Sequence, residues 1–429
     1  MKSSDSLIVR HVGLWLFIAY CLVCFHFTET KVFGVKINEL VSLLTIPFLL
    51  YSLRSVNKYI LYFFYLFLSF LALTFLFNLH TQFFLDIRGL TLLKMPYFIS
   101  LSRFGELVAC LAFAIIVNKT FNYYYSKGLS TDYLLKKVLD ANLCLSLLFL
   151  TVFLLTYLKI FSLADSNIIY NTTPYDILNP TPRLRGYYVE GGPFGLFYST
   201  FYILTFFLQG RKWVYRLVFI VVILCAQSKA GIVAVLAWHF YLFYQRFRYA
   251  SWFKYLVFIA LIPIFYIVFT KVVANYIYAV KHFSELVVLR KGDNNFMMGR
   301  IAAIHLIPNM VRDNPLWGIG LGNYALVRNN PAYLTALPAA QDWDAPGLGI
   351  FVTLIVENGI IGLCCFVLIL YLLYRRYAKQ SFLSAEALKA FALICLLGVQ
   401  LHFLYIWFFI GFALAAPNEK ELLNESGSI

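Results

Sequence analysis

The sequence predicts an all-α polytopic membrane protein, and three observations support this fold class. Of the 429 residues, 62% are hydrophobic and only 13% are charged, whereas a soluble domain carries about 25% charged residues. The apolar residues form long unbroken runs instead of the alternating pattern of a membrane β-barrel. In hydrocarbon every backbone N–H and C=O must be paired within its own segment, so we expect these runs to form helices.

A helix needs about 20 apolar residues to cross the bilayer core, and this length places the membrane spans. We expect them at residues 11–27, 35–53, 59–79, 97–117, 138–160, 187–208, 213–227, 231–246, 253–271 and 347–373. The apolar stretch 388–416 completes the set as two short helices. Residues 1–429 are therefore predicted to form a single integral membrane domain.

Lys229 decides how residues 213–246 are divided. One long helix would put this lysine in mid-bilayer, at a cost of about 2.5–3.5 kcal/mol. Two short helices that turn at residues 227–231 avoid that cost, and they leave the basic residues on both flanks on one side of the membrane. We therefore predict a hairpin with Lys229 at its tip. The tip is expected to be recessed, because about 15 residues per helix reach only part of the way across the core.

The basic residues also predict the topology. The formal net charge is +15, but most Lys and Arg residues fall in short clusters between apolar runs, which indicates topology signals and not a nucleic-acid surface. With a cytoplasmic N-terminus, two longer connections fall outside, namely residues 161–186 and 272–346. The second contains helical and turn signals, and a long connection of this kind is usually functional.

The outer connections nevertheless contain cations. They are Arg183, Arg185, Lys229, Lys271, Lys281, Arg290, Lys291, Arg300, Arg312 and Arg328. Guanidinium groups bind phosphate oxygens through paired, charge-assisted hydrogen bonds, so an outward basic cluster suits a lipid pyrophosphate. The alternative, that they meet lipid headgroups or water, stays open.

The segment from Arg183 to Gly195 runs from an outer connection directly into a span. Its glycines and proline allow an irregular helix start, which is tolerated at membrane depth beside protein or a wet cavity. Glu190 is placed as a general base, or as an ion-pair partner that orients Arg185 or Lys229. Further along, residues 299–304 indicate a helix start and residues 313–324 a helix stop followed by a tight turn.

Several other classes of function are disfavoured by the residues. No strand precedes the glycines near residue 320, and no G-x-G-x-x-G is present, so they do not indicate a dinucleotide loop. The seven histidines are scattered without ligand spacing, so we expect no metal site. No Walker A motif is present, which disfavours an ATP-driven pump. We also expect no cofactor.

Across nearly its whole length the chain resembles the O-antigen polymerase and ligase superfamily of bacterial membrane glycosyltransferases. The resemblance rests on segments in a fixed order: Arg-Gly-Tyr-Tyr-Val-Glu at 185–190, Ser-Lys-Ala-Gly at 228–231, Gly-Arg at 299–300, Asn-Pro-Leu-Trp-Gly-Ile-Gly-Leu-Gly-Asn at 314–323 and Glu-Asn-Gly-Ile-Ile-Gly at 357–362. The resemblance implies a GT-C-like bundle of about a dozen helices in the bacterial inner membrane, with one large periplasmic loop. It also implies a periplasmic active site that works without metal, and undecaprenyl pyrophosphate as the leaving group.

The resemblance also implies roles for particular residues. Arg185 and Arg300 match the family's essential arginines, and Lys229 stands where the family often has Arg after Ser. We expect Glu190 and Arg300 to be catalytic. The expected pyrophosphate ligands are Arg185, Lys229, Arg183 and Arg290, and the weaker glycan candidates are Asn323, Tyr324, Asp342 and Asp344.

One departure from the family separates polymerase from ligase. Ligases usually carry a His followed by Asn at the end of the long loop, whereas residues 341–348 here contain no histidine. This favours a polymerase of O-antigen, capsule or exopolysaccharide repeats over a ligase that transfers glycan to lipid A core. A transporter would show two related halves, and none are visible. The expected partners are the undecaprenyl-pyrophosphate-linked glycan, membrane lipid and a chain-length regulator.

Overall fold

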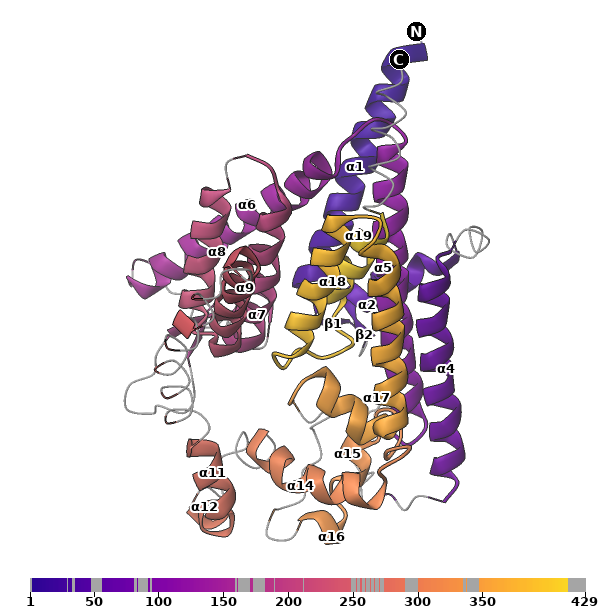
Figure 1. Cartoon of the computed structure of the whole chain (residues 1–429), viewed down its shortest axis with the longest axis vertical. Helices are drawn as coiled ribbons and strands as arrows, with labels where there is room; N and C mark the ends of the chain where they lie inside the picture. The colour runs from indigo at the N-terminus through magenta and orange to yellow at the C-terminus, as the bar shows by residue number, and fades with distance from the viewer. Residues whose placement is uncertain are drawn as a thin grey trace. The chain divides into compact units, whose positions relative to one another are not determined.

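The computed structural model shows a chain built almost entirely of helices (Figure 1). The residues it describes are 2–28, 30–32, 35–47, 56–80, 83, 92, 95–158, 160, 170–172, 182–188, 190–210, 212–247, 252, 255–256, 259, 263, 266, 270, 274–289, 300–334, 337 and 347–415. They form two compact units. Unit 1 comprises Met1–Phe64, Glu106–Leu236 and Leu368–Ile429, and unit 2 comprises Tyr65–Gly105 and Ala237–Val367.

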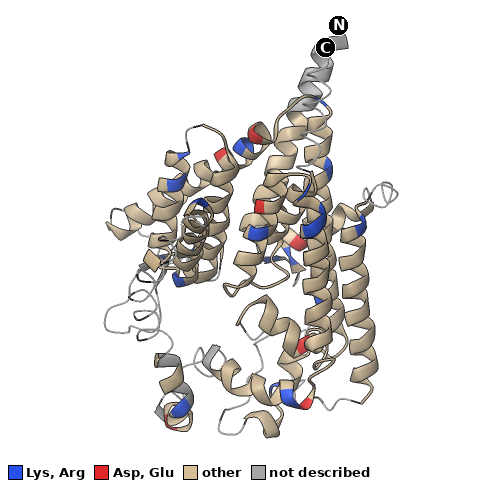
Figure 2. Ribbon diagram, viewed as in Figure 1, with Lys and Arg blue, Asp and Glu red and all other residues tan. Residues whose placement is uncertain are grey.

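Four helices in the described part are long and apolar enough to cross a membrane. They are α4 (Lys58–Asn78), α5 (Phe98–Tyr125), α6 (Thr131–Tyr157) and α17 (Ile350–Tyr377). Many of their exposed residues are apolar, among them Leu76 on α4 and Leu368 on α17, and charged residues are sparse along them (Figure 2). In water such faces would cause aggregation, whereas lipid covers them. The prediction of an all-α polytopic membrane protein is confirmed.

Most predicted spans coincide with helices, but four helices extend beyond the apolar runs. The helix α4 lies where expected, whereas α1 (Lys2–His26) begins before residue 11 and α6 before residue 138, and α5 and α17 continue past residues 117 and 373. At the start of α6 the hydroxyl of Ser130 accepts the N–H of Tyr133 at 3.2 Å, an N-cap that lets the polar first turns remain helical.

Two predicted spans lie partly outside the described residues. In the region 35–53 the structure shows α2 (Ile37–Leu44), and residues 48–53 are not described. Most of the span predicted at 253–271 is not described either. The C-terminal stretch forms two short helices as predicted, α18 (Phe382–Cys395) and α19 (Leu404–Ala415).

In unit 1, α7 (Gly191–Leu204) and α19 form the interior. Every residue of α19 and nearly every residue of α7 is buried, as expected for helices that are apolar on all sides. Aromatic rings connect them to α1, because Phe25 contacts Phe197, Phe201 and Phe408 with ring centroids 5.1–6.1 Å apart. Aromatic contacts of this kind add to the stability that burial gives.

The predicted helix break near Lys229 is confirmed. The helix α8 (Trp213–Cys225) ends before a short turn, and α9 (Lys229–Phe247) begins after it. Gln227 in the turn has a φ of 51°, a left-handed conformation that interrupts helical geometry. Tyr215 near the start of α8 donates a side-chain hydrogen bond to Asp140 on α6, and α6 packs along α8.

Short antiparallel strands complete unit 1. The strand β1 (Lys31–Val32) pairs with β2 (Val35–Lys36), and β3 (Tyr170–Thr172) pairs with β4 (Pro182–Leu184). In the second pair Asn171 lies opposite Arg183. The strand β4, which contains Arg183, leads directly into the segment before α7.

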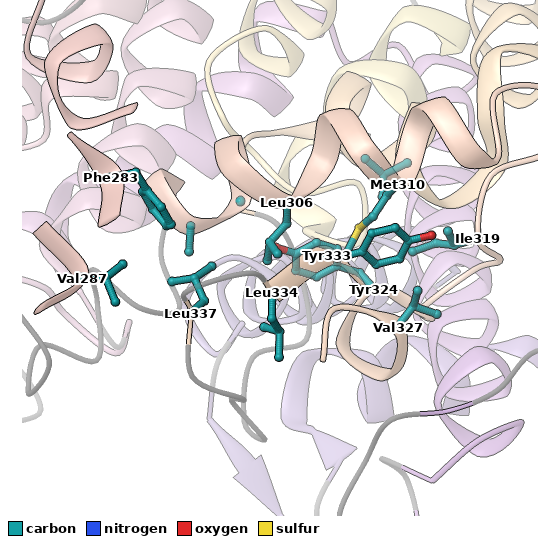
Figure 3. Packing of buried hydrophobic residues seen from close by; sticks show 13 residues of the cluster. Phe283, Val287, Leu306, Met310, Ile319, Tyr324, Val327, Tyr333, Leu334 and Leu337 are labelled. Atoms are coloured by element: carbon teal, nitrogen blue, oxygen red, sulfur yellow. The ribbon is translucent and has the colours of Figure 1, made fainter. Parts of the chain in front are cut away.

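In unit 2 the long connection folds around its own core (Figure 3). Its helices are α11 (Ala274–Lys281), α12 (Phe283–Leu289), α14 (Arg300–Asp313), α15 (Tyr324–Val327) and α16 (Pro331–Leu334). Leu306 and Met310 project from α14 toward Tyr324 and Tyr333. The predicted helix start near residue 300 and stop near residue 313 are both confirmed.

Candidate functional site

In unit 1 the segment that begins at Arg183 meets the turn between α8 and α9. The Arg183 side chain donates to the carbonyl of Ala226 at 3.2 Å and to that of Gln227 at 3.4 Å. The last carbonyls of a helix lack partners within the helix and carry partial negative charge, so a guanidinium is favourable there. Arg183 therefore ties β4 to the end of α8.

Glycines allow the first turns of α7 and α9 to approach closely. A Cβ added to Gly195 would lie 2.3 Å from the Cβ of Ser228, and one added to Gly231 would lie 2.6 Å from the carbonyl oxygen of Gly195. The Ser228 hydroxyl donates to the carbonyl of Gly192 at 2.6 Å and accepts the N–H of Gly231 at 3.1 Å. We call this contact the α7–α9 junction, and it holds the two helix starts in a fixed geometry.

The junction presents charged side chains at its edge. Glu190 immediately precedes α7, is exposed and makes no capping hydrogen bond, while Lys229 is the first residue of α9 and is also exposed. Arg185 is half-buried and precedes Glu190 by five residues in the chain. The first N–H groups of both helices add partial positive charge. The junction therefore gathers cations, one carboxylate and two helix starts at one end of unit 1, a combination suited to an anionic ligand.

Two tyrosines attach this segment to the end of α1. The Tyr188 hydroxyl donates to the carbonyl of Phe25 at 2.7 Å, and the Tyr187 ring stacks on Phe27 with centroids 4.8 Å apart. The turn at Gly186 has a φ of +55°, a conformation that glycine adopts without strain. The tyrosines of the Arg-Gly-Tyr-Tyr segment thus have structural partners in α1 and just after it.

In unit 2 a broken helix holds the glycine-rich loop. Gly359 interrupts α17 with φ 65° and ψ −174°. The carbonyls of Val356 and Glu357 accept N–H groups from Ile319 and Gly320 at 2.9 and 2.8 Å. After the break, the N–H of Ile360 donates to the carbonyl of Pro315 at 2.9 Å. The loop therefore satisfies backbone groups that an interrupted membrane helix would leave without partners.

Asn323 and Tyr324 follow this loop and are both buried. The Asn323 amide donates to the carbonyl of Ile319 at 2.8 Å and to the side chain of Asn78 at 2.7 Å. Burial raises the pKa of Tyr324 to about 12, and burial lowers the pKa of the neighbouring Arg328. These contacts support a structural role for both residues, and glycan binding by them stays a prediction.

The remaining predicted site residues are placed only in part. Arg300 is the first residue of α14 in unit 2, whereas Arg183, Arg185, Glu190 and Lys229 belong to unit 1. That Arg300 acts together with the α7–α9 junction stays a prediction. Arg290, Asp342 and Asp344 lie outside the described residues.

A buried ionic cluster in unit 1 was not predicted. Lys36 contacts Glu39 at 2.7 Å and Glu106 at 2.9 Å, and the His402 ring lies 3.6 Å from the second oxygen of Glu106. All four side chains are at most 13% exposed. A signal existed in the sequence, because Glu106 falls inside the span predicted at 97–117, and carboxylates at membrane depth almost always have partners. Within the described part of the chain, no group of three or more His, Cys, Asp or Glu residues is placed to hold a metal ion.

Residues 214–367 match a protein-family model described as O-antigen ligase. The matched region begins in α8, contains the Ser-Lys-Ala-Gly turn and the whole long connection, and ends within α17. No curated protein matches the chain.

Proposed function

Because residues 214–367 match a family model described as O-antigen ligase, we propose that the protein polymerises lipid-linked glycan repeat units at the periplasmic face of the bacterial inner membrane. The growing glycan is carried on undecaprenyl pyrophosphate. It is transferred to the terminal sugar hydroxyl of an incoming lipid-linked repeat unit, and a chain-length regulator is a further proposed partner.

The observation that carries this proposal is the α7–α9 junction. During transfer the bond from the sugar's anomeric carbon to the pyrophosphate oxygen breaks, and the acceptor hydroxyl oxygen forms the new bond. The departing pyrophosphate gains charge, which Arg185, Lys229 and Arg300 would stabilise. Fixed cations aimed at developing charge are among the largest contributions to catalysis. Glu190 would accept the hydroxyl proton.

Arg183 and Arg290 have less direct roles in this proposal. Arg183 donates to two carbonyls at the end of α8, so it would position Lys229 while adding positive charge near the pyrophosphate. Arg290, in the long connection, would be a further pyrophosphate ligand. Residues 341–348 lack the histidine that ligases usually carry there. Asp342 and Asp344 would provide polar groups in its place and bind the glycan.

A ligase is the second candidate, because the matching family is described as O-antigen ligase. Deleting the gene and comparing the surface glycan with that of the parent strain separates the two functions. A polymerase predicts single repeats on the acceptor. Loss of all glycan from lipid A core, with accumulation of lipid-linked polymer, would instead show a ligase, and an unchanged polymer would refute both.

Complementation then tests the junction itself. Arg185→Ala should fail to restore long glycan although the protein accumulates, and Arg185→Lys should restore little, because a single ammonium cannot reproduce the paired hydrogen bonds of a guanidinium. Arg376→Ala is the matched control. Arg376 is an exposed arginine at the end of α17, and it should restore full-length glycan.

A further inference from the structure

A pocket of about 640 Å³ opens in unit 2 where α14 ends. Its polar and aromatic lining includes His80, Asp313, Asn314, Trp317, Asn330 and Tyr333. Small-molecule sites combine apolar and aromatic walls with a few polar groups that fix orientation, and this lining has that composition. The transfer step proposed above makes no use of the pocket.

The walls of the pocket are held by the surrounding backbone. Trp317 belongs to the loop that pairs with the break in α17, and a Cβ at the next residue, Gly318, would lie 2.4 Å from the backbone of Glu357. The indole is nevertheless 46% exposed, so part of it is open to a ligand. Tyr333 is only 6% exposed. Burial and the carboxylate of Asp313, to which its hydroxyl donates, raise the pKa of Tyr333.

Charge in the pocket favours sugar over phosphate. Among the described residues that line it there is no lysine or arginine, and Asp313 contributes a carboxylate. The Asp313 carboxylate lies 3.4 Å from Arg312 at the exposed surface. A pyrophosphate would meet negative charge without a lining cation. Sugar hydroxyl groups, in contrast, donate to Asp313 and bond with the amide of Asn330, while the C–H face of a sugar ring packs on Trp317.

A smaller cavity of about 60 Å³ shares Phe77 and Trp317 with this pocket. It lies between α4 and α17, and its lining is mainly apolar, with Leu66, Phe70 and Ile361 among the residues. Both helices are long and apolar enough to cross a membrane. At about 60 Å³ this cavity is far smaller than a ligand pocket of about 300–1,000 Å³, so it lies outside the proposed subsite.

We infer that the pocket is a subsite for uncharged sugar units of the lipid-linked glycan. This inference rests on the proposed function and deepens it, because it assigns sugar recognition to unit 2. Asn323 supports the subsite by holding the loop that contains Trp317. Trp317, Asp313 and Asn330 contact the sugar.

Binding of a labelled glycan by the purified full-length protein in detergent tests the subsite. The probe is the neutral oligosaccharide released from the encoding strain's surface polysaccharide by mild acid and carrying a fluorescent amine label, measured by anisotropy. Trp317→Ala should weaken binding roughly tenfold or more, and Trp317→Phe should lose less because a ring remains. Trp213→Ala removes an indole that is 63% exposed in unit 1, and it should bind as the wild type does.

The source of the sugar and its charge are tested with two further probes. Trp317→Ala should weaken binding of a lipid-linked repeat unit as well, whereas equal binding of that unit by Trp317→Ala and the wild type would show that the pocket does not hold the sugar of the lipid-linked glycan. An oligogalacturonate of equal length should bind more weakly, because Asp313 repels its carboxylates. Equal or tighter binding of the acidic glycan would overturn the assignment to uncharged sugars.

The inference and the proposed function fail in different ways. If Trp317→Ala binds all glycan probes as the wild type does, or if the wild type binds none, the subsite is wrong whatever the protein catalyses. If Trp317→Ala and wild type differ as expected but the purified protein forms no polymer, the subsite stands and the proposed reaction fails. Arg185→Ala should keep glycan binding while losing transfer.

Discussion

Gly195→Ala tests the α7–α9 junction most severely. The added methyl carbon would lie 2.3 Å from the Cβ of Ser228, whereas carbon atoms in contact sit about 3.5–4.0 Å apart. The two helices would therefore have to separate by about 1.2 Å, the difference between 3.5 and 2.3 Å. Ser228 cannot turn its Cβ away, because that atom is fixed by the backbone.

The expected cost follows from this displacement. Overpacking a well-packed core costs about 1–3 kcal/mol, and we expect the upper part of that range because the Ser228 bond to Gly192 must lengthen as well. The helix propensity of Ala over Gly offsets only about 0.5–1 kcal/mol of this cost. The variant should unfold at lower temperature than the wild type in detergent, and it should make less polymer because Glu190 and Lys229 are displaced.

Gly105→Ala is the matched control. Gly105 lies inside α5, and a Cβ added there meets nothing within 4 Å. Alanine should leave stability unchanged or raise it by about 0.5–1 kcal/mol. The assay is thermal unfolding followed by fluorescence of a thiol-reactive dye, with polymer formation measured on the same preparations. Equal stability and equal polymer from the two variants would show that α7 and α9 do not meet as described.

Three further perturbations test other parts of the structure. Lys36→Met should destabilise the protein by about 3–5 kcal/mol, because it removes the cation that two buried carboxylates contact. Glu39→Gln should cost less, and the reverse order in thermal unfolding would contradict the described cluster. A cysteine at position 229 should react from outside the cell with an impermeant maleimide in a protein whose native cysteines are replaced, while one at position 376 should not, and labelling of position 376 would refute the topology. Gly359→Ala should prevent accumulation, because its Cβ would lie 2.1 Å from the Leu316 carbonyl oxygen. Gly398→Ala is the control, because Gly398 also has a positive φ, +88°, but a Cβ added there meets nothing within 4 Å. Accumulation of both variants at the same level would show that the contact with Leu316 is absent.

The fold was largely predictable because hydrocarbon allows few backbone solutions. Long apolar runs had to become helices, and the cost of a lysine in mid-bilayer placed the break between α8 and α9. The limits of α5 and α6 were missed because polar residues prolong both helices beyond the apolar runs. Hydropathy measures where a helix meets lipid, while caps such as Ser130 decide where it begins.

The site was predictable only where charge and chain order pointed to it. The segment from Arg183 to Glu190 and the turn at Lys229 were both identified, but their contact depends on glycines that carry no charge or periodicity. The pairing of the glycine-rich loop with the break in α17 was also hidden, because it joins backbone groups from residues about forty positions apart. The hydrogen bonds by which the buried Asn323 amide holds the loop were also not predicted, and glycan binding by Asn323 stays a prediction.

Polymer formation by the purified protein from lipid-linked repeat units tests the central claim most directly. If Arg185 and Arg300 hold the pyrophosphate, Arg300→Lys should lose much of the activity, and Arg300→Ala and Arg185→Ala nearly all of it. One lost transition-state contact of this type costs about 2.7–4 kcal/mol, which slows the reaction roughly 100- to 1,000-fold. All three proteins should still insert and accumulate as the wild type does. Near-wild-type polymer from both alanine variants would contradict the account, because these arginines would then meet only lipid headgroups or water.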